Sequence, residues 1–167
     1  MNLAIDHGNT RIKAGVFEQT NLIQTLSFED SNTFNEWLDK NEFENAIVSS
    51  VARSTDNLMD KINSNGKKIF MSQSTPFPIA VKYSTPLTLG LDRIAAACGT
   101  LDIIPGGHRL AIDLGTCINY EFVDDLANYY GGAISPGVKM RFEAMHTFTA
   151  RLPLVNFVDN PPLVGNS

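Results

Sequence analysis

One six-residue pattern occurs twice in this chain, and it constrains the fold more than any other feature. Residues 3–8 read LAIDHG and residues 110–115 read LAIDLG, so five of six positions agree. In each copy an apolar run typical of a strand leads into a polar turn and then a second strand-like run. The repeat predicts two similar lobes, each with an Asp-x-Gly turn at a strand end, and a cleft between them. Coincidence is the alternative for so short a match.

The first lobe alternates strands with helices, which is typical of an α/β domain. One helix is expected to start at a Ser31 cap, because apolar residues follow at helical spacing, and a second is expected over 55–63. Strands are expected at 3–5, 11–17, 22–28, 46–48 and 67–71.

The segment 72–86 holds three prolines and is expected to be irregular. A helix is expected over 91–103, and the turn at 105–107 marks the domain boundary. The prediction is a first domain of residues 1–107 and a second of residues 108–167. The second should contain strands at 110–112 and 119–123, a hairpin around Tyr129 and Tyr130, and a helix from Lys139 to about Phe148 that covers one face of the sheet.

Composition excludes several classes of protein. The 167 residues carry 13 basic and 18 acidic side chains, a net charge of −5, which argues against a nucleic-acid binder with a broad basic surface. No stretch approaches the roughly 18 apolar residues of a membrane span, and the first residues do not resemble a signal peptide. Two isolated cysteines, Cys98 and Cys117, suit a reducing compartment. We therefore expect a cytoplasmic protein that binds neither nucleic acid nor membrane.

The two Asp-x-Gly turns suggest phosphate binding. Glycine lets backbone N–H groups approach a phosphate, and an aspartate at the strand end can hold the cation that neutralises it. Around the first turn, Asn9 and Thr10 add donors and Lys13 adds a positive charge. The alternative is that Asp6 and Asn9 only form local hydrogen bonds in a β-turn. The second copy favours the phosphate interpretation.

Residues 6–13, DHGNTRIK, resemble the first nucleotide motif of the type III pantothenate kinases. Other motifs of that family follow in the same order along the chain. They are PLTLGLDR at 86–93 with Tyr83 upstream, DLGT at 113–116, GGAISPG at 131–137 and TARLP at 149–153. Each motif is modest alone, but together they extend the resemblance over nearly the whole chain.

The resemblance implies both a fold and a function. The family belongs to the acetate and sugar kinase, Hsp70 and actin superfamily, in which two ribonuclease-H-like α/β domains hold ATP in a cleft. Its members use ATP with Mg²⁺ to phosphorylate pantothenate to 4'-phosphopantothenate, the first step of coenzyme A biosynthesis. They are homodimers and need a monovalent cation. The alternatives are a non-catalytic regulatory protein on the same scaffold, and a different kinase or Hsp70-like ATPase.

The family motifs also imply roles for individual residues. Asp92 matches the base that takes the proton from the primary hydroxyl of pantothenate, a task that suits a carboxylate in phosphoryl transfer. Arg93 could bind anionic substrate groups or stabilise charge on the transferring phosphoryl. Asp113 matches the ligand of the monovalent cation, K⁺ or NH₄⁺. Without the family, Asp92 and Arg93 would be an exposed pair in the first turn of a helix.

The remaining expected site residues fall into two sets. The substrate-binding set is Tyr83, Gly90, Leu91, Asp92 and Arg93. The ATP-binding set is Asp6, His7, Gly8, Asn9, Thr10, Arg11, Ile12, Lys13 and Thr116. Residues 131–137 are expected either to shape a strand and turn near the nucleotide and the dimer partner or to form a tight hairpin.

The chain departs from the family pattern in two ways. After the second turn the family commonly continues A-x-T-x-D, where this chain has Cys117, Asn119 and Glu121. Family members also extend further, with a substrate-contacting threonine just past Ser167. We therefore expect an incomplete second domain whose sheet lacks cover on one face. Residues 1–167 would then be part of a longer chain or need a partner, and alone would bind a hydrophobic dye and show little kinase activity.

Overall fold

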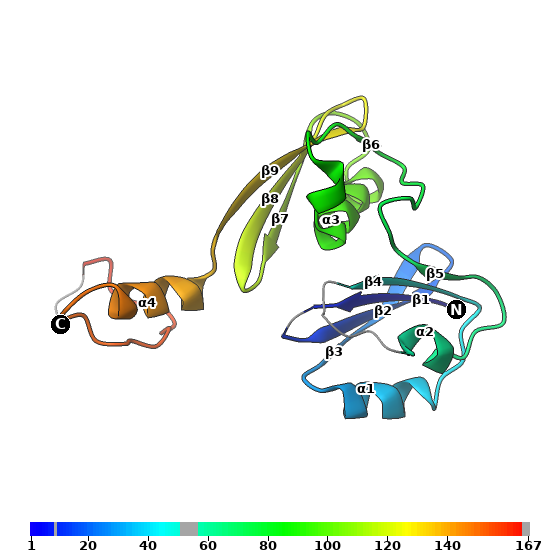
Figure 1. Ribbon diagram of the computed structural model, residues 1–167, viewed down its shortest axis with the longest axis horizontal. Coiled ribbons are helices and arrows are strands. Elements are labelled where there is room, and N and C mark those ends of the chain that lie inside the picture. Colours follow the sequence, from blue (N-terminus) through cyan, green and yellow to red (C-terminus); the bar gives the residue numbers. More distant parts are fainter. Residues whose placement is uncertain (9, 51–56, 165–167) are drawn as a thin grey trace.

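The computed structural model describes residues 1–8, 10–50 and 57–164, which form a mixed α/β protein with two sheets (Figure 1). The first sheet has the strand order β3-β2-β1-β4-β5. β1 to β3 form an antiparallel meander, and β4 and β5 run parallel to β1. The strands lie where the sequence predicts them: β1 (Asn2–His7), β2 (Ile12–Glu18), β3 (Asn21–Phe28), β4 (Asn45–Ser50) and β5 (Lys68–Phe70).

One face of this sheet forms the first core. Alternate residues of β1 and β2, among them Leu3, Ile5 and Val16, are buried together with Phe34 and Leu38 of α1 (Ser31–Leu38). α1 and α2 (Leu58–Lys61) both lie on this side of the sheet (Figure 1). The opposite face is left free to line a cavity.

The two helices of the first lobe differ from expectation at their ends. The Asp30 carboxylate accepts hydrogen bonds from the N–H groups of Asn32 (2.9 Å) and Thr33 (3.0 Å), so Asp30 rather than Ser31 caps α1. α2 has a single turn, because the backbone is extended again at Ile62. The helix expected over 55–63 is therefore too long, and its first two residues lie outside the described ones.

The irregular segment after β5 leads into the second sheet. A short strand that the sequence did not predict, β6 (Ala80–Val81), pairs in parallel with β9 (Asn128–Pro136). A 3₁₀ turn at Pro86–Thr88 then precedes α3 (Leu91–Ile103), which has the predicted bounds. The side chain of Gln73 ties this segment together by donating to the carbonyl of Leu89 at 2.7 Å.

α3 packs on the second sheet, whose strand order is β6-β9-β8-β7. β7 (Arg109–Leu114) and β8 (Cys117–Val123) are antiparallel, and a turn at 124–127 joins β8 to β9. Residues 131–136 therefore lie within β9, and the tight hairpin considered for this motif is wrong. The boundary expected after residue 107 stays a prediction, although α3 shares its core with the second sheet.

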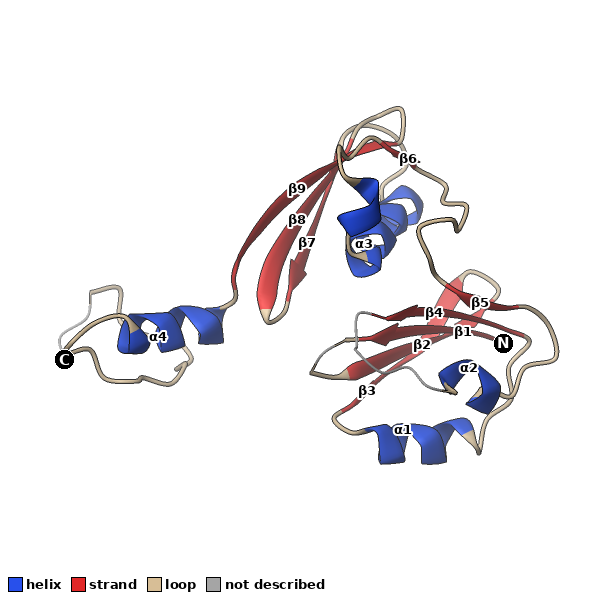
Figure 2. Cartoon of the chain, in the orientation of Figure 1, coloured by secondary structure: helices blue, strands red, loops and turns tan. Residues whose placement is uncertain are grey.

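The two faces of the second sheet are covered unequally. Val123 and Tyr129 are fully buried beneath α3. Leu110, Ile112 and Leu114 of β7 point the other way and are 52%, 52% and 75% exposed. α4 (Val138–Thr147) forms as expected but buries no residue and lies apart from the sheet (Figure 2). The prediction that this helix covers a face of the sheet is wrong; α3 provides the cover.

None of the helices in the described part of the chain combines the length and apolar character that crossing a membrane requires.

Candidate functional site

A cavity of about 850 Å³ lies between the free face of the first sheet and α3. Four residues of the expected site line it: Asp6 and Lys13 from the first sheet, Asp92 from α3, and Asp113 from β7. They come from three separate parts of the sequence. The fold therefore brings the two Asp-x-Gly turns and the helix between them to one cavity.

The three carboxylates interact electrostatically. Burial raises the pKa of Asp6 above its ordinary value, and the negative charges of Asp92 and Asp113 raise it further. Lys13 opposes these effects, with its Nζ 3.9 Å from Asp6 Oδ2. This excess of negative charge suits a bound cation. Among the described residues, however, no three carboxylate, imidazole or thiol groups lie close enough together to form a ready-made metal site.

The two turns close in similar ways. The N–H of Gly8 donates to the carbonyl of Arg11 at 3.1 Å, and that of Gly115 donates to Cys117 at 2.9 Å. Thr116 accepts a hydrogen bond from the N–H of Gly137 at 3.0 Å, so the GGAISPG motif ends against the second turn. Both turns thus present a strand-end aspartate next to a tightly folded backbone.

The other expected ATP-binding residues are placed differently. Asn9 lies outside the described residues. The side chain of Ile12 is buried in the first core, and Arg11 forms an exposed ion pair with Glu29 at 2.9 Å. His7 Nδ1 is buried without a hydrogen bond among the described residues. For Ile12, any contact with a nucleotide would therefore have to come from its backbone.

The start of α3 explains the Gly-Leu-Asp-Arg sequence. Gly90 is the N-cap, and any Cβ at this position would collide with the carboxylate of Asp92. Leu91 packs on the second core, whereas Asp92 faces the cavity. A carboxylate in the first turn of a helix also interacts favourably with the helix dipole. Glycine therefore gives the Asp92 side chain the space to sit over the helix start.

Arg93 points away from the cavity, into the second sheet. Its Nε and Nη2 donate to the two carboxylate oxygens of Glu121 at 2.6 and 2.9 Å. The guanidinium carbon lies 5.8 Å from the centroid of the Tyr83 ring. Gly131, at φ 101°, makes room for this ring, because a Cβ there would lie 2.6 Å from it. The motif residues Tyr83, Arg93 and Gly131 thus form one packed group.

Sequence reasoning missed Ser49 as a site residue. It lines the cavity, pairs with Asp6 across β1 and β4, and is 5% exposed, yet its Oγ makes no hydrogen bond among the described residues. Its position in the polar pair that ends a buried strand was the available signal. Cys98 also lines the cavity, where burial raises the pKa of its thiol to about 11 and keeps it protonated.

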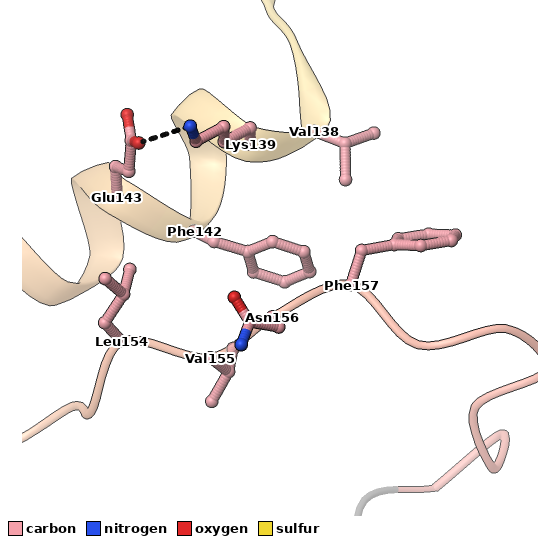
Figure 3. Close-up of a pocket in the computed structure, with 8 residues that line it drawn as sticks. All are labelled: Val138, Lys139, Phe142, Glu143, Leu154, Val155, Asn156 and Phe157. Carbon is pink, nitrogen blue, oxygen red and sulfur yellow. Dashed lines mark ion pairs between the residues drawn. The ribbon is translucent and has the colours of Figure 1, made fainter.

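A second cavity, of about 450 Å³, lies between α4 and residues 154–157 (Figure 3). Val138, Phe142 and Phe157 give it an apolar lining. Its charged groups, Lys139 and Glu143, form an exposed ion pair with each other at 3.8 Å. None of the expected catalytic or binding residues lines it.

Comparison of the sequence with known proteins identifies its family. A family model described as type III pantothenate kinase matches residues 2–167. The chain belongs to the type III pantothenate kinase family. As a kinase family, it implies ATP and a divalent metal as cofactors.

Individual relatives agree with this assignment. The type III pantothenate kinase of Flavobacterium johnsoniae is 41% identical over 172 residues, covering 100% of this chain and 70% of the relative. That of Flavobacterium psychrophilum is 38% identical, and the match covers 100% of this chain and 71% of the relative. That of Bacteroides fragilis is 40% identical, and the match covers 99% of this chain and 69% of the relative. The crystal structure of a protein from Campylobacter jejuni, described as a conserved putative Baf family transcriptional activator, matches 95% of this chain and 68% of its own, with TM-score 0.54 and 18% identity. That last similarity concerns the fold alone.

Proposed function

We propose that this protein phosphorylates pantothenate with ATP, giving 4'-phosphopantothenate in coenzyme A biosynthesis. The observation that carries the proposal is the meeting of Asp6, Asp92 and Asp113 at one cavity. Membership of the type III pantothenate kinase family supports the same reaction. Phosphoryl transfer depends on positioning and on neutralising charge, and a cleft lined by carboxylates and a lysine offers both.

In this proposal the first turn holds the phosphates of ATP. Free backbone N–H groups of the turn after Asp6 and the Lys13 ammonium would contact phosphate oxygens, and Thr116 would contact the nucleotide from the second turn. Asp6 would hold Mg²⁺, directly or through water, because its carboxylate lies at the cavity together with those of Asp92 and Asp113. When bound, Mg²⁺ neutralises charge on the phosphates.

Asp92 acts as the base. It would accept the proton of the primary hydroxyl of pantothenate as that oxygen forms a bond to the γ-phosphorus and the bond to the ADP oxygen breaks. Its place at the start of α3, facing the cavity between the two turns, suits a base set between the bound substrates. Tyr83, Gly90, Leu91 and Arg93 do not line the cavity themselves and would support the pantothenate site from behind Asp92.

Further features of the family are proposed on the same basis. Asp113 is exposed at the end of β7 and would bind K⁺ or NH₄⁺. The strand order of the first sheet and the similar hairpin that opens the second support two ribonuclease-H-like domains. We also propose a homodimer that works in the cytoplasm.

The test is phosphate transfer from ATP to pantothenate by the protein at its natural length, with and without K⁺. Mass spectrometry should detect 4'-phosphopantothenate, and omission of the monovalent cation should reduce its formation. A folded protein that binds ATP but transfers no phosphate to pantothenate would contradict the proposal and favour a regulatory role for the scaffold.

A further inference from the structure

Glu121 is the most deeply buried acidic residue among those described, and it lies directly under the start of α3. Its side chain is 1% exposed and that of Arg93 is 10% exposed. Three donors surround the carboxylate: Nε and Nη2 of Arg93, and the hydroxyl of Tyr129. This bidentate contact with an added phenol hydrogen bond satisfies most of the acceptor capacity of the carboxylate.

Such a group is costly to bury unless its partners are fixed. Removing one member of a buried ion pair leaves an unpaired charge, whereas a well-packed apolar replacement of both members is often tolerated. Burial and the neighbouring Glu121 raise the pKa of Tyr129, so its hydroxyl remains a donor at neutral pH. The Arg93–Glu121–Tyr129 group is therefore a rigid attachment of α3 to β8 and β9.

The attachment matters because of where Arg93 lies on the helix. Consecutive residues of an α-helix are about 100° apart around its axis, so Asp92 and Arg93 point in different directions. Holding the Arg93 side chain against Glu121 fixes the rotation of the first helical turn, which turns Asp92 toward the cavity. Leu91 and the buried Ile94 also pack this turn against the second core. The Arg93–Glu121 contact adds a directional tie at the residue next to Asp92.

We propose that Glu121 is a positioning residue: through Arg93, and with support from Tyr129, it sets the direction of Asp92 at the cavity. The proposal rests on the proposed kinase function.

The test uses the natural-length protein with Glu121→Gln, Arg93→Met and the double variant, and with Glu143→Gln as a control in an exposed ion pair. Glu121→Gln should lower kcat about 10- to 100-fold and change the KM for ATP less than threefold. Glu121→Asp, which keeps the charge, should recover most of that loss. Because Glu121 acts through Arg93, the double variant should be no slower than Arg93→Met alone.

Thermal melting separates positioning from a general effect on folding. Glu121→Gln should melt several degrees lower because it leaves a buried cation unpaired, and the double variant should recover part of that loss without recovering activity. Losses of rate that multiply in the double variant, or activity that returns together with the melting temperature, would overturn the proposal.

A crystal structure of Glu121→Gln provides a readout that does not depend on the substrate. We expect the side chains of Arg93 and Asp92 to have moved; unchanged positions would overturn the positioning role. A wild-type protein that does not phosphorylate pantothenate would contradict the proposed function instead, and the crystal structure would still decide the role of Glu121.

Discussion

The two Asp-x-Gly turns have nearly the same sequence but different surroundings. Asp6 faces Lys13 across the β1–β2 pair, whereas Asp113 faces the neutral Asn119 across the β7–β8 pair. β1 lies between two strands, but β7 is the edge of its sheet in the described part of the chain. The repeat therefore places an aspartate at the same position in both turns, while the residues around each aspartate determine the charge near its carboxylate. This difference fits a first turn that works with the phosphates of ATP and a second that binds a single ion.

The largest effect should come from the residue between the two turns. Asp92→Asn removes a proton acceptor with little change in volume, so kcat should fall by about 100- to 10,000-fold. ATP binding, measured by calorimetry, should stay within a few-fold of wild type because the nucleotide turn is unaltered. Asp125→Asn, an exposed acid in the turn after β8, is the matched control. A decrease in kcat of tenfold or less would show that Asp92 is not the base.

The next prediction separates the two turns. Asp6→Asn should lower kcat/KM for MgATP by about tenfold or more at every K⁺ concentration, since it removes the carboxylate proposed to hold Mg²⁺ at the phosphate site. Asp113→Asn should instead raise the K⁺ concentration needed for half-maximal activity. Titration of K⁺ against initial rate measures both. Identical K⁺ titrations for Asp113→Asn and wild type would show that Asp113 does not bind the monovalent cation.

The sequence predicted the strands, the helix 91–103 and the family motifs, because each depends on local pattern and spacing. It did not predict the β6–β9 pairing, which joins residues far apart in the chain. It also missed the group around Glu121, whose members come from α3, β8 and β9, and the buried hydroxyl of Ser49. Contacts of this kind depend on how the elements pack, and no local pattern contains that information.

A smaller effect concerns stability. Because the pKa of Asp6 is raised in the folded protein, its ionisation costs stability as pH rises from the unfolded value of about 3.8 through the higher folded value. Without ATP or Mg²⁺ at pH 7, Asp6→Asn should therefore melt a few degrees above wild type at most. The difference should shrink as the pH is lowered toward 3.8. An Asp6→Asn protein that melts below wild type at pH 7 would show that Asp6 stabilises the fold.

The smallest expected effect concerns the uncovered face of the second sheet. Residues 1–167 should bind a hydrophobic dye, and replacing Leu110, Ile112 and Leu114 together by threonine should lower the fluorescence by about a third. Threonine keeps the β-propensity of the strand while reducing its apolar surface. Leu22→Thr with Ile23→Thr on β3, each 53% exposed in wild type, is the control for general loss of apolar surface. An equal decrease in dye fluorescence in the control would show that the dye does not bind specifically to the exposed side chains of β7.

The most direct test of the shared site is a crystal structure with a non-hydrolysable ATP analogue, Mg²⁺ and pantothenate bound together. We expect the nucleotide phosphates to contact the turn after Asp6, and the primary hydroxyl of pantothenate to lie about 2.6–3.2 Å from Asp92. Asp113 should lie at the same cavity, with the monovalent cation beside it. A nucleotide bound in the second cavity, between α4 and residues 154–157, or a pantothenate hydroxyl facing away from Asp92, would show that the three carboxylates do not form the active site.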